Sequence, residues 1–133
     1  MPRPKILIVD CHEDVLIALE NLFENNGFDT TTAWTAGDAM RLLDLVAFDL
    51  VLLNEYLSEG PAEEVLRAMR RRGIGTPCMI LQPSAPPMLD SRSFRSLGVV
   101  GIACKHQAVE LLEKVRDHLD SVRLRRELER VPA

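Results

Sequence analysis

Chemically active side chains directly follow four short apolar stretches of the sequence. They are a carboxylate, a thiol, two carboxamides and an ammonium, supplied by Asp10, Cys11, Asn54, Gln82 and Lys105. Carboxylate and amide oxygens can contact a hard cation, an ammonium neutralises negative charge, and a thiol can react or bind a soft metal. This chemistry becomes available only if the fold brings the five residues to one place.

Short apolar runs alternate with longer stretches of helical periodicity. The runs predict strands at residues 5–9, 28–33, 49–53, 77–81 and 99–104. The helical stretches predict helices at 13–26, at 36 to about 46, from 60–61 to the basic residues 70–72, at 88–97 as a weaker helix, and from about residue 107. Thr35 is the expected N-cap of the second helix, and Pro61 the expected first residue of the third.

Five strand–helix units in succession predict a parallel sheet covered by helices on both faces. In sheets of this kind, binding and catalysis occur at the carboxyl ends of the strands. The five active residues follow those ends, so they are expected to meet at one rim.

Composition narrows the classes of function. The chain has 133 residues, which suits one domain, and its net charge of −4 disfavours a nucleic-acid-binding domain. Three cysteines are too few for a disulfide framework and favour a reducing compartment. No apolar stretch approaches the length of about 20 residues that spans a bilayer, so no membrane contact is expected.

The sequence resembles bacterial response-regulator receiver domains over roughly residues 4–119. The matching stretches are residues 6–10 (ILIVD), 48–53 (FDLVLL) and 76–81 (TPCMIL), together with Lys105. The resemblance implies a single doubly wound, flavodoxin-like (βα)5 sheet of strand order 2-1-3-4-5. It also implies a signalling module rather than an enzyme, in which Mg²⁺ and a lysine assist phosphorylation of an aspartate after the third strand.

Only part of that machinery matches. Asp10 and Lys105 match the first acidic position and the lysine, whereas Cys11 occupies the second acidic position. Asn54 occupies the phosphoacceptor position, that of the phosphorylated aspartate. Gln82 occupies the position of the switch hydroxyl, the serine or threonine hydroxyl that bonds the phosphoryl group in receivers. Ile102 occupies the position of the switch aromatic, the aromatic residue of the last strand that commonly moves when a receiver is phosphorylated.

Asn54 is the decisive departure, because an amide has no anionic oxygen with which to attack phosphorus. No metal is expected, or weak Mg²⁺ at most, with Asp10, Asn54 and Tyr56 as weak candidate ligands. The preferred interpretation is a degenerate pseudo-receiver that acts through phosphorylation-independent protein contacts. The alternative is an ordinary phosphorelay receiver whose aspartate was replaced by Asn54; the changes at Cys11 and Gln82 weigh against it.

Cys11 is interpreted as a half-buried filler in preference to a reactive thiol. Asp10, Cys11 and His12 include three possible zinc ligands, but adjacent residues rarely converge on one metal, so His12 is interpreted as a surface histidine. Without phosphate, Lys105 is expected to pair with Asp10 and to donate to Asn54.

Residues 120–133 are predicted to be a helical extension or linker beyond a domain at 4–119. In this extension, Leu124, Leu128 and Val131 lie about 200° around the helix from the preceding apolar stripe, so they require another partner. The expected partners are a histidine kinase or a downstream output domain. A homodimer could form through the extension or through the face made by residues 88–97, 99–104 and the last helix. A bacterial, cytoplasmic location is expected.

Overall fold

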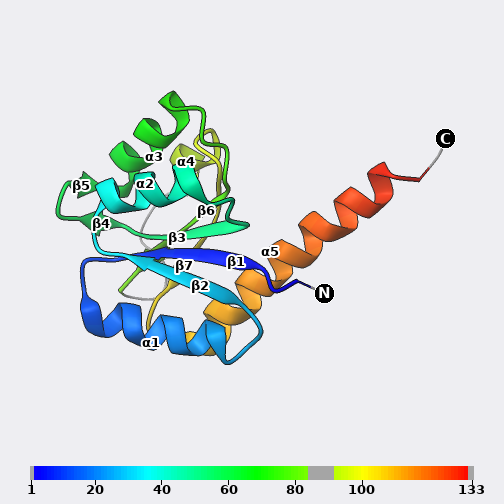
Figure 1. Ribbon diagram of the computed structural model, residues 1–133, viewed down its shortest axis with the longest axis horizontal. Helices are drawn as coiled ribbons and strands as arrows, with labels where there is room; N and C mark the ends of the chain where they lie inside the picture. The colour runs from blue at the N-terminus through cyan, green and yellow to red at the C-terminus, as the bar shows by residue number, and fades with distance from the viewer. Residues whose placement is uncertain (1, 84–91, 132–133) are drawn as a thin grey trace.

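The computed structural model describes residues 2–83 and 92–131, and these contain one five-stranded parallel sheet. The strand order is β2-β1-β3-β6-β7, which is the predicted order once a separate two-stranded pair, β4 and β5, is set aside. The strands of the sheet are β1 (Lys5–Val9), β2 (Asp29–Ala33), β3 (Leu50–Asn54), β6 (Cys78–Gln82) and β7 (Val99–Cys104). The fold prediction is confirmed (Figure 1).

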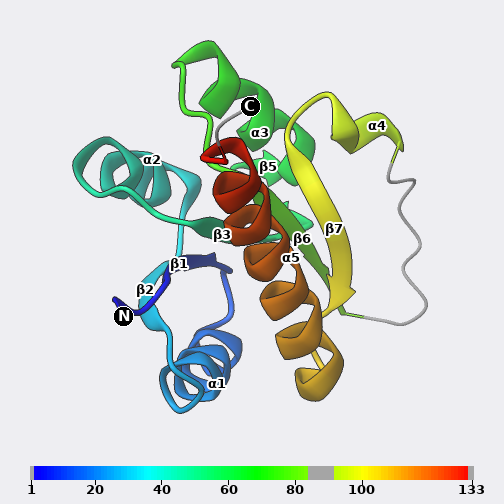
Figure 2. The same cartoon turned by 90° about the vertical axis from the view of Figure 1, so that its right-hand side faces the viewer.

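Helices connect successive strands of the sheet and cover both of its faces (Figure 2). They are α1 (Glu13–Glu24), α2 (Ala36–Leu45), α3 (Ala62–Arg71), α4 (Arg92–Arg95) and α5 (Ala108–Glu129). α4 is a single turn, whereas the sequence predicted a helix at 88–97; residues 88–91 of that prediction lie outside the described residues.

Alternation of side chains along the strands divides the core into two layers. Leu7, Val51 and Ile80 point into a cluster that also contains buried residues of α2 and α3. Their neighbours Ile8 and Leu52 point into the other cluster, with buried residues of α1 and α5. The central strands are therefore apolar on both faces, which explains why they appear in the sequence as continuous apolar runs.

Helix starts were predicted with mixed success. The Thr35 hydroxyl accepts a hydrogen bond from the Asp38 backbone N–H, as an N-cap should. The prediction for Pro61 was wrong: it is the N-cap of α3, and with Gly60 it forms β5, which pairs antiparallel with β4 (Tyr56–Leu57). Gly60 has φ +137° and a Cβ there would lie 2.7 Å from a Glu64 carboxylate oxygen, so this turn needs glycine.

α5 continues well beyond the sheet and projects from the body of the molecule (Figure 1). Its first turns bury Leu111, Leu112 and Val115. Leu124 and Leu128, further along, are more than half exposed. Among the described residues, no helix is both long and apolar enough to cross a membrane.

Arg70 holds the end of α3 against the loop before β7. Its Nε donates to the Leu97 carbonyl oxygen over 2.7 Å, and its Nη1 donates to the Ile74 carbonyl oxygen over 2.6 Å. A side chain at Gly98 would collide with this guanidinium. The Arg70 side chain is therefore packed against the loops after α3 and before β7, and it is not freely solvated at the end of the helix.

We expect Arg70→Ala to lower the free energy of unfolding by about 1.5–3 kcal/mol, because it removes two hydrogen bonds from a charged donor. Arg71→Ala, one residue away and exposed, is the matched control and should change stability by less than about 0.5 kcal/mol. Urea unfolding measures both. Equal losses in the two variants would show that Arg70 acts only through its charge at the helix end.

Candidate functional site

The sheet brings the predicted residues together at the carboxyl ends of its central strands. β1 lies between β2 and β3, and β6 lies between β3 and β7, so the residues after these strands share one rim. Asp10, Asn54, Gln82 and Lys105 are the buried polar or charged residues of the described chain, each at most 8% exposed. Because these four groups are buried, each of them requires a hydrogen-bond or ion-pair partner.

Lys105 links two of the strands through its ammonium group. Its Nζ lies 3.0 Å from Asp10 Oδ2 and 3.2 Å from Asn54 Oδ1. Asp10 is fully buried and the Lys105 side chain is 5% exposed, so this ion pair is shielded from solvent. The pairing expected from the sequence is present.

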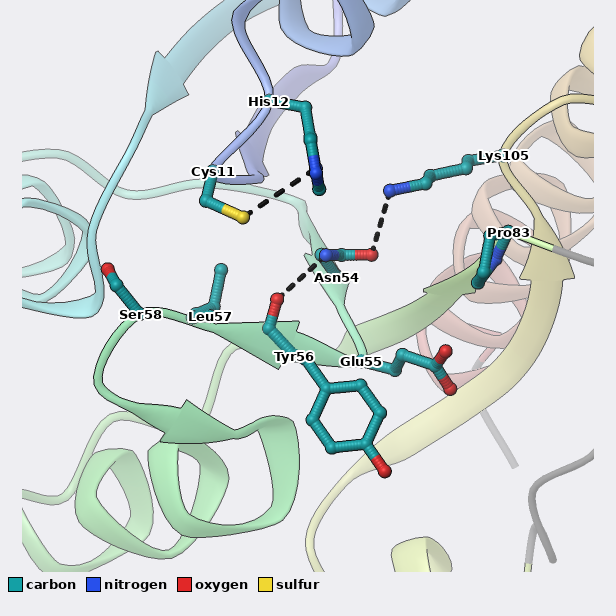
Figure 3. A pocket seen from close by; sticks show the side chains of 9 residues that line it. All are labelled: Cys11, His12, Asn54, Glu55, Tyr56, Leu57, Ser58, Pro83 and Lys105. Atoms are coloured by element: carbon teal, nitrogen blue, oxygen red, sulfur yellow. Dashed lines mark hydrogen bonds between the residues drawn. The ribbon is translucent and has the colours of Figure 1, made fainter.

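Asn54 has both ends of its carboxamide occupied. Its Nδ2 donates to the Tyr56 carbonyl oxygen over 2.7 Å, while its Oδ1 accepts from Lys105 (Figure 3). An ammonium can only donate and a carbonyl can only accept, so these two partners fix which end is nitrogen. The carboxamide is thus a bridge between an ammonium and a main-chain carbonyl, a role that a carboxylate could not fill.

This arrangement does not fit Mg²⁺, the ion that the receiver resemblance implies. Mg²⁺ requires an octahedral set of oxygen ligands. The Asn54 nitrogen, not an oxygen, faces the Tyr56 carbonyl, and the Asn54 oxygen is bonded to Lys105. Asp10 is then the one carboxylate among these candidate ligands, and one of its oxygens is bonded to Lys105 as well.

Gln82 connects the rim to the residue after Asn54. Its Nε2 donates to Glu55 Oε2 over 3.1 Å. Sequence reasoning missed this contact, because Glu55 offered no pattern that distinguished it from a surface carboxylate. Ile102, in β7, is buried in the core cluster shared with α2 and α3.

A pocket opens above these side chains. It is lined by residues from the ends of β1 and β3 and from two neighbouring segments: Cys11, His12, Asn54, Glu55, Tyr56, Leu57, Ser58, Pro83 and Lys105 (Figure 3). Its floor therefore combines the Asn54 carboxamide and the Lys105 ammonium, and its wall carries a thiol and an imidazole.

Asp10, Cys11 and His12 converge, contrary to the expectation that adjacent residues would diverge. One ligand atom from each lies within 4.8 Å of the others. The His12 Nδ1 lies 2.9 Å from Asp10 Oδ1 and 3.6 Å from the Cys11 sulfur. The chain bends at Cys11 between β1 and α1, so the alternation of a strand no longer separates consecutive side chains. His12 is nevertheless exposed, as predicted.

The three thiols differ sharply in accessibility. Cys11 is exposed, whereas Cys78 and Cys104 are buried. The interpretation of Cys11 as a half-buried filler was therefore wrong. Burial raises the pKa of the Cys78 thiol to about 11, so at pH 8 only about one molecule in a thousand carries the thiolate there.

We expect a thiol-specific reagent at pH 8 to modify one cysteine of the folded chain quickly, and Cys11→Ser to abolish that fast phase. Cys104→Ser is the control and should retain it. A fast phase that persists in Cys11→Ser would mean that a buried thiol becomes accessible on the timescale of labelling.

Comparisons with known proteins agree with the observed fold. The putative positive transcription regulator of virulence factors BvgA from Bordetella pertussis is 27% identical over 104 residues, which cover 77% of this chain and 49% of that protein. A CheY-like response regulator receiver domain protein from Methanospirillum hungatei is 26% identical, with a TM-score of 0.77 over 90% of this chain and 95% of that one. The chain therefore has the fold of response-regulator receiver domains.

A second solved receiver domain, of a putative Luxo repressor protein from Vibrio parahaemolyticus, has a TM-score of 0.81 and 21% identity, covering 96% of this chain and 98% of the other. No family model matches the sequence. The chain spans about half the length of the curated relatives it matches, such as BvgA.

Proposed function

We propose that this receiver domain signals through protein contacts without accepting a phosphoryl group. The observation that carries the proposal is the Asn54 carboxamide, which stands at the phosphoacceptor position with both of its ends bonded. A neutral amide nitrogen that is already donating to a carbonyl has no electron pair suited to attack on phosphorus.

Two further positions support the proposal. Cys11 stands where a second acidic ligand would be, and Gln82 stands at the position of the switch hydroxyl, where it donates to Glu55. A single replacement of an aspartate in an ordinary phosphorelay receiver would leave these two positions intact. These two positions therefore favour a degenerate receiver over an ordinary phosphorelay receiver with one replaced aspartate.

Partner contact is the remaining means of signalling. We infer that a histidine kinase or a downstream output domain is the natural partner, because the receiver domain spans only half of relatives that are transcription regulators by name. We also assign residues 4–119 to the domain and 120–133 to a helical extension, whose exposed Leu124 and Leu128 supply an apolar surface for a partner or a second copy.

A double variant tests the extension. Leu124→Lys with Leu128→Lys should remain folded, because both side chains are exposed, and should be monomeric by light scattering. If the natural chain is a dimer and the variant stays dimeric, the extension is not the contact between copies.

Phosphoryl uptake tests the main proposal. The chain is incubated with a small acyl phosphate donor and Mg²⁺, and its intact mass is then measured beside that of an ordinary receiver treated in the same way. We expect the chain to be unmodified while the reference gains a phosphoryl group. A phosphoryl group on the chain, mapped to a rim residue, would refute the proposal.

A further inference from the structure

The cluster Asp10–Cys11–His12 combines three different metal-ligand types at one point of the rim. A carboxylate oxygen, a thiol sulfur and an imidazole nitrogen lie within 4.8 Å of one another. Sulfur and imidazole ligands favour zinc and related transition metals over Mg²⁺. We propose that these three residues bind a zinc-like divalent ion.

The interatomic distances approach those of a tetrahedral zinc site. With Zn–N and Zn–O near 2.0 Å and Zn–S near 2.3 Å, tetrahedral angles separate nitrogen from sulfur by about 3.5 Å and nitrogen from oxygen by about 3.3 Å. The Cys11 sulfur lies 3.6 Å from His12 Nδ1, and Asp10 Oδ1 lies 2.9 Å from the same nitrogen. The Cys11 sulfur and the Asp10 carboxylate oxygen lie within 4.8 Å of each other, compared with about 3.5 Å in a tetrahedral site. Binding thus requires the oxygen and nitrogen to separate by about 0.4 Å and the sulfur to approach the carboxylate, movements that the exposed side chains of Cys11 and His12 would make.

The surroundings hold the carboxylate in position. Asp10 is fully buried, and its second oxygen accepts from Lys105. A ligand that is itself hydrogen-bonded by a second layer of residues is kept in one orientation. The cluster also borders the pocket of Figure 3, which leaves a fourth coordination position open to a water molecule or to a ligand from solution.

The charges and protons balance on binding. The Cys11 thiol releases its proton to solvent and binds as the thiolate. The His12 Nδ1 donates to Asp10 Oδ1 in the free chain, so on binding it gives up this proton and faces the metal, while Nε2 takes up a proton from solvent and the ring stays neutral. The Asp10 carboxylate and the Cys11 thiolate then neutralise the two positive charges of the ion. The Lys105 ammonium stays on the far oxygen of Asp10 and reduces the affinity without occupying a ligand atom.

This inference goes beyond the proposed function and does not depend on it. The phosphoryl test concerns Asn54, whereas the metal site depends on the Cys11 sulfur and the His12 ring. A chain that accepts phosphate could still bind the metal, and a chain that is inert to phosphate could fail to bind it.

Cobalt(II) titration of the full chain, under reducing conditions, tests the site because a thiolate ligand gives Co²⁺ a charge-transfer absorption band. We expect one equivalent to bind with a Kd in the micromolar range and Zn²⁺ to displace it. Cys11→Ser should abolish the charge-transfer band, and His12→Ala should weaken binding at least about tenfold. His106→Ala, an exposed histidine on the same rim, is the matched control and should bind as the natural chain does.

Two results would overturn the proposal. One is the absence of any cobalt–thiolate band in the natural chain at micromolar protein concentration. The other is a band that persists in Cys11→Ser, which would assign the metal to a different thiol.

Discussion

Replacing Lys105 by methionine is expected to lower the free energy of unfolding by about 3–5 kcal/mol, because it leaves a buried carboxylate without its counterion. Asp10 is fully buried and its Oδ2 lies 3.0 Å from the Lys105 ammonium. The same change removes the donor to Asn54 Oδ1. Globular domains are stable by only about 5–15 kcal/mol, so the loss would be a large part of the total.

Two further variants make this prediction specific. Lys114→Met removes an ammonium that donates over 2.8 Å to the Ile102 carbonyl oxygen, and it should cost only about 0.5–1.5 kcal/mol. Asp10→Asn combined with Lys105→Met removes both charges and should recover part of the loss of Lys105→Met. Urea unfolding that shows Lys105→Met and Lys114→Met to be equally stable would contradict a shielded ion pair at the rim.

Changing Asn54 to aspartate is expected to destabilise the chain by about 1–3 kcal/mol and still not to yield a phosphorylated product. A carboxylate oxygen would replace the Nδ2 that lies 2.7 Å from the Tyr56 carbonyl oxygen, so two acceptors would face each other. The variant also places a second buried carboxylate beside the single ammonium of Lys105. Cys11 and Gln82 would remain as the other departures from the receiver pattern.

Asn26→Asp is the matched control for stability. The Asn26 Nδ2 also donates to a carbonyl oxygen over 2.7 Å, that of Leu22, but the residue is only partly buried and Arg116 lies beside its Oδ1. We expect a loss below about 1 kcal/mol there.

The intact mass of the Asn54→Asp chain after treatment with an acyl phosphate donor and Mg²⁺ completes the test. A stable acyl phosphate on the Asn54→Asp chain would favour the ordinary phosphorelay receiver.

The sheet and its rim could be predicted because they depend on sequence patterns that are local and that recur in each strand. Strands buried on both faces must be continuous apolar runs, as in β1 and β3, and parallel strands must end at the same edge. These two rules alone placed Asp10, Asn54 and Lys105 together. The pairing of Lys105 with Asp10 then follows from opposite charges in a buried site.

The details of the turns could not be predicted in the same way. The pair β4–β5 depends on the backbone conformation of Gly60, and it makes Pro61 an N-cap. The convergence of Cys11 and His12 on Asp10 depends on one bend in the main chain. Such features arise from single φ and ψ angles, which leave no periodic trace in a sequence.

The Asn54 carboxamide itself offers the most direct test, through its side-chain NH₂ signals in a ¹⁵N-resolved NMR spectrum of the chain. If the amide bridges Lys105 and Tyr56 and neither the metal nor the phosphoryl chemistry of a receiver operates there, these signals should stay unchanged when Mg²⁺ and an acyl phosphate donor are added. A saturable shift of the Asn54 signals with Mg²⁺, accompanied by shifts at the ends of β6 and β7 once the donor is present, would contradict the account.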